Sequence, residues 1–161
     1  DTIVHIDDID AHAPQLSLGM TAFHLDAGYT PLYAFGYGLS YTTFEYRDIA
    51  VDANEIRMGG TVTISAQLTN TGDTAADEVI QLYVRDLVGN VTRPVKELKG
   101  FQRLRLEPGE SRRIDFSLHT NDLAFFGRDN QLVTETGEFH AWIGGSSDTE
   151  LRTHFRIIDS D

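Results

Sequence analysis

Carboxylates offer the first chemistry that this sequence could perform. Glycoside hydrolysis within one chain needs two carboxyl groups roughly 5 to 10 Å apart, one of them in a dry pocket that raises its pKa. Glu135 and Glu138 are close in sequence, but they flank the Thr136-Gly137 turn, which we expect to be wet. Spacing marks no other pair, and no Gly-x-Ser-x-Gly nucleophile elbow is present. The sequence therefore predicts no catalytic residue.

Metal and nucleotide sites are also weakly supported. Asp7, Asp8 and Asp10 could bind calcium, but their loop lacks the glycine and the distal glutamate of an EF-hand, so a solvated acidic run is favoured. Gly36 and Gly38 lack the third glycine and the strand-to-helix context of a nucleotide-binding turn. We expect no metal and no cofactor, since the chain has no cysteine and no helical His-x-x-x-His pair. Its histidines are scattered: His5, His12, His24, His119, His140 and His154.

Two aromatic residues could bind sugar. Tyr83 and Trp142 alternate out of the predicted core, so each could stack on a pyranose ring from the wet face of a strand. Aromatic rings on such a face are more often covered by a neighbouring domain or a long loop. An independent carbohydrate-binding module stays open as an alternative function.

The stretch PLYAFGYGLSY at 31–41 is too irregular for an amphipathic helix and too rich in glycine for a regular strand. We interpret it as a joint between domains, although its rings could instead cap the core of their own domain. Tyrosine and phenylalanine rings are large interface anchors, and glycine lets the backbone turn sharply or approach a neighbour closely. The candidate interdomain anchors are Tyr33, Phe35, Gly36, Tyr37, Gly38 and Tyr41.

The sequence predicts that these candidate residues are carried by, or lie next to, β-strands. From Phe44 onward, apolar residues recur at every second position in five runs, which indicates strands with one dry face. Glu107-Pro-Gly-Glu110 places proline and glycine at the centre of a type II turn. The pattern predicts an all-β fold: an antiparallel two-sheet sandwich of fibronectin type III or immunoglobulin kind, with an irregular N-terminal extension. The dry sets are Val62, Ile64, Ala66, Leu68; Ile80, Leu82, Val84; Ile114, Phe116, Leu118; Phe139, Ala141, Ile143; and Leu151, Phe155, Ile157.

Charge and hydropathy exclude two classes of partner. The formal net charge of −12 over 161 residues repels phosphate backbones, so we expect no nucleic acid. No apolar run reaches the roughly 18 residues that a membrane helix needs, so we expect no membrane partner. The beginning of the chain, DTIVHIDDID, shows no signal peptide pattern.

Longer blocks of sequence resemble a known family. PLYAFGYGLSYTTFEY at 31–46, LTNTGDTAADEVIQLYVRD at 68–86, RPVKELKGFQRLRLEPGES at 93–111 and GEFHAWIGGSS at 137–147 are similar, in order and spacing, to the C-terminal part of glycoside hydrolase family 3 enzymes. These are the β-glucosidases and their β-xylosidase relatives. Ala34, where proline is common, and LAFFGRDNQ at 123–131, where an acidic loop is more usual, depart from the family pattern.

The resemblance implies an organisation and a function. Residues 1–42 would be a linker and the terminal segment that completes a preceding α/β sandwich domain, and residues 43–161 a fibronectin type III-like domain. The expected partners are the catalytic (β/α)8 barrel and the α/β sandwich, in the same chain or a separate one, together with the parent's oligosaccharide or glycoside substrate. The retaining carboxylates of the family belong to those upstream domains, so the resemblance transfers no catalytic residue. It implies a secreted or periplasmic accessory module of a β-glucosidase-like enzyme.

Overall fold

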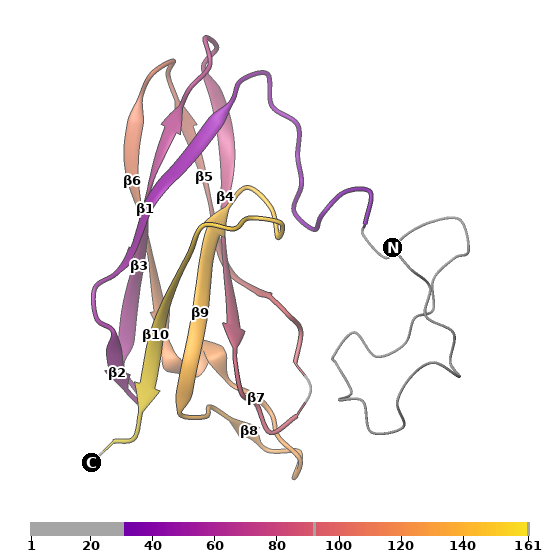
Figure 1. Cartoon of the computed structure of the whole chain (residues 1–161), viewed down its shortest axis with the longest axis vertical. Coiled ribbons are helices and arrows are strands. Elements are labelled where there is room, and N and C mark those ends of the chain that lie inside the picture. Colours follow the sequence, from indigo (N-terminus) through magenta and orange to yellow (C-terminus); the bar gives the residue numbers. More distant parts are fainter. Residues whose placement is uncertain (1–30, 92, 161) are drawn as a thin grey trace, which may run out of the picture. The chain divides into compact units, whose positions relative to one another are not determined.

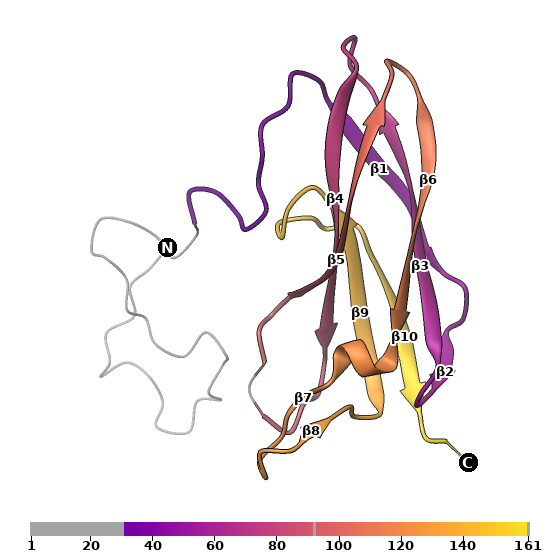
Figure 2. The same cartoon turned by 180° about the vertical axis from the view of Figure 1, so that it is seen from behind.

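Two β-sheets face each other across one apolar core (Figures 1 and 2). The computed structural model describes residues 31–91 and 93–160. Its strands are β1 (Phe44–Val51), β2 (Glu55–Arg57), β3 (Thr61–Asn70), β4 (Ala76–Asp86), β5 (Glu97–Leu106), β6 (Ser111–His119), β7 (Phe125–Phe126), β8 (Leu132–Val133), β9 (Gly137–Gly144) and β10 (Arg152–Ile158), with one 3-10 turn at Thr120–Leu123.

The strand order confirms the predicted sandwich. One sheet has the order β1-β3-β6 and the other β2-β10-β9-β4-β5, while β7 and β8 form a small separate hairpin. Neighbouring strands are antiparallel except for β2, which pairs with β10 in parallel. This exception arises because the chain crosses from the first sheet to the second between β1 and β2, so that β2 extends the edge of the second sheet.

The predicted dry faces form the core. All of the predicted core residues are buried except Leu151, which is half-buried against the same cluster. The Phe139 and Phe155 rings stack across β9 and β10 with their centroids 5.5 Å apart. Each large apolar side chain removed from water in this way contributes about 1.5–3 kcal/mol to stability, so the alternating pattern accounts for the packing of the two sheets.

The turn between β5 and β6 also has its predicted geometry. Gly109 has φ of +73°, and the Glu110 amide donates to the Glu107 carbonyl oxygen at 3.0 Å. A type II turn requires positive φ at its third position, where glycine carries no steric penalty.

Residues Tyr33–Asp161 form one compact unit, which includes the segment that precedes β1. We call residues 33–41 the neck. Within the described ranges, no helix is both long and apolar enough to cross a bilayer. The assignment of residues 1–42 and 43–161 to two different domains stays a prediction.

Candidate functional site

The neck presents its aromatic rings to solvent. Tyr33, Phe35 and Tyr37 are more than half exposed, and Tyr41 is 97% exposed. The Tyr33 and Tyr37 rings stack on each other with centroids 5.2 Å apart. These rings therefore contribute nothing to the core of the described sandwich, which removes the alternative that they cap it. Their role as interdomain anchors stays a prediction.

The backbone of the neck is held against the outer face of β4 by Gln81. This side chain is 4% exposed, and its Nε2 donates to the carbonyl oxygens of Gly36 at 3.1 Å and of Gly145 at 2.6 Å. The Tyr83 hydroxyl donates to Gln81 Oε1 and lies 3.3 Å from the Phe35 carbonyl oxygen. Both ends of the amide are thus satisfied, and one buried side chain ties the neck to the loop after β9.

The two glycines of the neck differ in what they contact. Gly36 has φ of +79°, a conformation that favours glycine, and a Cβ atom there would displace the Gln81 carboxamide that binds the neck. A Cβ atom on Gly38 would meet no atom within 4 Å of the described chain. No described residue therefore approaches Gly38 closely. The close approach to a neighbour stays a prediction that would involve a partner outside these residues.

Tyr83 and Trp142 lie on the outer faces of β4 and β9, as the alternation pattern predicted, but both rings are covered. Tyr83 is 1% exposed and Trp142 is 7% exposed, so the expectation of two wet-face rings is wrong. The two residues are paired across β4 and β9, on the outer face that the neck and the loop after β9 cover. Neither ring is free to stack on a sugar, and the basis for an independent carbohydrate-binding module is lost.

A half-buried lysine helps to close this cover. Lys96 Nζ donates to the carbonyl oxygens of Ser147 at 2.7 Å and of Thr149 at 2.8 Å, and it lies 4.9 Å from the Trp142 ring centroid. Charge-assisted hydrogen bonds and a cation–π contact both stabilise a lysine removed from water. Burial lowers the pKa of Lys96. The segment before β5 is thereby fixed to the loop after β9.

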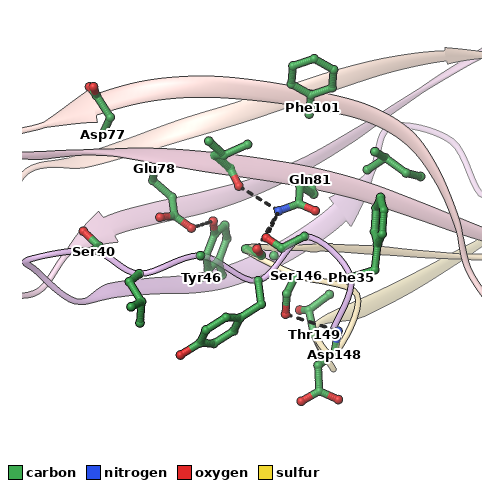
Figure 3. A pocket seen from close by; sticks show the side chains of 18 residues that line it. Phe35, Ser40, Tyr46, Asp77, Glu78, Gln81, Phe101, Ser146, Asp148 and Thr149 are labelled. Carbon is green, nitrogen blue, oxygen red and sulfur yellow. Dashed lines mark hydrogen bonds between the residues drawn. The ribbon is translucent and has the colours of Figure 1, made fainter. Parts of the chain in front are cut away.

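A hollow of about 650 Å³ lies beside the neck (Figure 3). The neck lines it from Phe35 to Ser40, and β5 lines it with Leu98 and Phe101. Phe101 is 70% exposed, and Val79 of β4 is also exposed at the same rim. Phe35 and Tyr37 of the neck and these strand residues are thus exposed apolar side chains around one hollow, and we call them the rim.

The hollow also contains a hydrogen-bonded pair of polar side chains. The Tyr46 hydroxyl of β1 donates to Glu78 Oε1 of β4 at 2.7 Å, which joins the two sheets across the opening (Figure 3). Burial raises the pKa of the Glu78 carboxyl, although the Tyr46 hydrogen bond acts in the opposite direction. Burial, and then the charge of Glu78, raise the pKa of Tyr46. Both groups are therefore held in an environment that disfavours added negative charge.

The two carboxylates that the sequence brought close, Glu135 and Glu138, contact different partners. Glu135 Oε2 accepts from the Asn90 amide at 3.2 Å, whereas Glu138 Oε1 lies 3.7 Å from His140 Nε2. His119 caps the 3-10 turn by accepting from the Asn121 amide. In residues 31–91 and 93–160 no group of three acidic or histidine side chains could hold a metal ion. Asp7, Asp8, Asp10, His5, His12 and His24 lie outside the described residues.

Sequence reasoning missed Glu78, Gln81 and Phe101. One signal was available: Glu78 shares its alternation phase with Ile80, Leu82 and Val84, so an acid occupies a dry position of β4. Gln81 carried no such signal, because a polar residue on the outer phase of a strand is expected to be wet. Its burial depends on the neck, whose path a strand pattern does not describe.

Comparison with known proteins places this geometry in a family. The model of the family described as "Fibronectin type III-like domain" matches residues 78–147, from β4 to the loop after β9. A putative beta-xylosidase of Formosa agariphila is 43% identical over 127 residues, which are 79% of this chain and 17% of that protein. The periplasmic beta-glucosidase of Salmonella typhimurium is 34% identical over 154 residues, 96% of this chain and 20% of that protein.

This chain carries the fibronectin type III-like domain of glycoside hydrolase family 3. A solved structure agrees: the beta-glucosidase from Listeria innocua in complex with glucose matches with a TM-score of 0.78 and 32% identity, over 84% of this chain and 19% of that one. The family 3 domain spans a fifth or less of the length of these relatives. In the described part of the chain, the match covers Gln81 and Tyr83, which bind the neck, and Lys96, which binds the loop after β9.

Proposed function

We propose that this chain is the C-terminal accessory module of a longer family 3 glycoside hydrolase, and that it packs on the catalytic domains and stabilises them. The parent reaction is hydrolysis of terminal, non-reducing β-D-glucosyl residues from an oligosaccharide or glycoside, carried out by carboxylates outside this chain. The parent acts in the periplasm or outside the cell, in keeping with the periplasmic relative.

One observation carries this proposal: the neck rings are exposed although their backbone is fixed. A flexible tail would leave its aromatic rings exposed without holding the main chain, but here Gln81 and the Ser147 amide bind the carbonyl oxygens of Gly36 and Phe35. Exposed apolar rings on a preformed surface mark an interaction site, because a surface of this kind is costly to leave in water. Relatives about five times longer supply a natural partner for it.

Exposed apolar residues are also present on the sheet beside the neck. Phe101 and Val79 line the same hollow as Phe35 and Tyr37, so the apolar surface has two walls from separate elements. Aromatic side chains are enriched at the centres of protein interfaces, where they supply most of the binding energy. The catalytic domains would cover both walls at once.

A graft tests the proposal. The whole chain replaces the matching region of the Salmonella periplasmic beta-glucosidase, which corresponds to 96% of this chain. We expect the graft to keep the hydrolytic activity of that enzyme and to unfold in one transition, and a version that lacks the region altogether should melt lower. A graft that melts no higher than the truncated enzyme would contradict the proposed role.

A further inference from the structure

We infer that the Glu78 carboxylate receives a cationic side chain, arginine or lysine, from the catalytic domains when the module docks. This inference rests on the proposed function and names the chemistry at the centre of the docking surface. It begins from an acid at a dry position of β4, which projects between the sheets and lines the hollow.

Glu78 lacks a charge partner within the described chain. In residues 31–91 and 93–160, its one hydrogen bond from a side chain is the one from Tyr46, and no lysine or arginine pairs with it. An ionised carboxylate has about four acceptor positions, so acceptor capacity remains. A partly buried charge without a partner is costly, and the cost grows when more water is removed.

Docking would remove that water. The rim around Glu78 is apolar on two sides, with Phe35 and Tyr37 on the neck and Phe101 on β5. A partner that covers these rings also closes the hollow over the carboxylate. Desolvation of the uncompensated carboxylate opposes docking, so a group from the partner that compensates the charge makes docking more favourable, and a cation compensates a carboxylate best.

Neighbouring charges favour a cation over an acceptor. Asp77 and Asp148 line the same hollow, so every ionisable side chain that lines it besides Tyr37 and Tyr46 is acidic. Arg103 pairs with Asp77 at 2.5 Å, and Lys96 binds backbone carbonyl oxygens, so both of these cations have other partners. No lysine, arginine or histidine of the described residues forms an ion pair with Glu78. The raised pKa of its carboxyl agrees with this lack of compensation.

Glu78→Gln in the graft tests the inference. Glutamine keeps the shape of the side chain and an oxygen that accepts from Tyr46, but it removes the charge. We expect the melting temperature of the graft to fall by a few degrees while that of the free chain stays the same or rises. Glu55→Gln, at an exposed position on β2 outside the hollow, is the matched control and should change neither protein.

A titration gives an independent readout. The pKa of Glu78, followed by NMR of the carboxyl carbon, should fall from its raised value in the free chain when the chain is part of the graft. An approaching cation favours the charged form, whereas burial without a cation would raise the pKa further. A pKa that rises on docking, or a Glu78→Gln graft that melts like Glu55→Gln, would overturn the inference alone. If removal of the neck rings also left the graft unchanged, the proposed function would fail and the inference with it.

Discussion

Replacing Phe35 and Tyr37 together with alanine lowers the melting temperature of the graft by several degrees, if the neck docks as proposed. Both rings are more than half exposed in the described unit, yet they stand on a backbone that is already fixed. Aromatic residues at the centre of an interface often cost about 2 kcal/mol or more each when truncated. We therefore expect a loss of about 4 kcal/mol of docking free energy, measured by calorimetry of the graft.

The free chain provides the internal control for this double substitution. Because neither ring belongs to the sandwich core, the unfolding midpoint of the free chain should change little. Phe126→Ala is the matched control in the graft, since Phe126 is 64% exposed on β7 and does not line the hollow. A graft that melts at the same temperature with and without the two neck rings would contradict the docking role.

Gln81→Leu should destabilise the free chain by about 2–4 kcal/mol. Leucine fills a similar volume, so the expected loss comes from polar groups rather than from a cavity. The carbonyl oxygens of Gly36 and Gly145 lose their donor, and the Tyr83 hydroxyl loses the nearer of its two acceptors, all at a site that is nearly closed to water. Urea unfolding of the full chain measures the free energy.

Loss of Gln81 should also release the neck. Limited proteolysis should cleave within residues 33–41 faster in Gln81→Leu than in the parent chain, because the hydrogen bonds to Gly36 hold that backbone. Gln102→Leu is the control: Gln102 is exposed on β5, and its Nε2 donates to the Asp115 carbonyl oxygen at 2.7 Å. Equal rates of cleavage within residues 33–41 for the two variants would show that the amide of Gln81 does not fix the neck.

The strands and their dry faces were predictable because alternation is a local signal. Val62, Ile64 and Leu68 lie on one side of β3 whatever the rest of the chain does, and a period of two fixes which side of the strand each residue occupies. The turn at Glu107–Glu110 was predictable for a similar reason, since proline and glycine restrict the backbone by themselves.

The outer face of β4 was not predictable from alternation. Whether Tyr83 and Trp142 are wet depends on the neck and on the loop after β9, which are distant in sequence and follow no period. The same holds for Gln81, a polar residue whose burial becomes favourable only when two carbonyl oxygens and a hydroxyl meet it. Irregular segments carry this part of the structure, and their paths are set by tertiary contacts.

Side-chain labelling of the neck tests the central claim most directly. Hydroxyl-radical footprinting reports the solvent exposure of individual aromatic rings, and it can compare the free chain with the graft. The docking account predicts that Tyr33, Phe35 and Tyr37 react readily in the free chain and are protected in the graft, while Phe126 reacts equally in both. Equal labelling of the neck rings in a folded, active graft would contradict it.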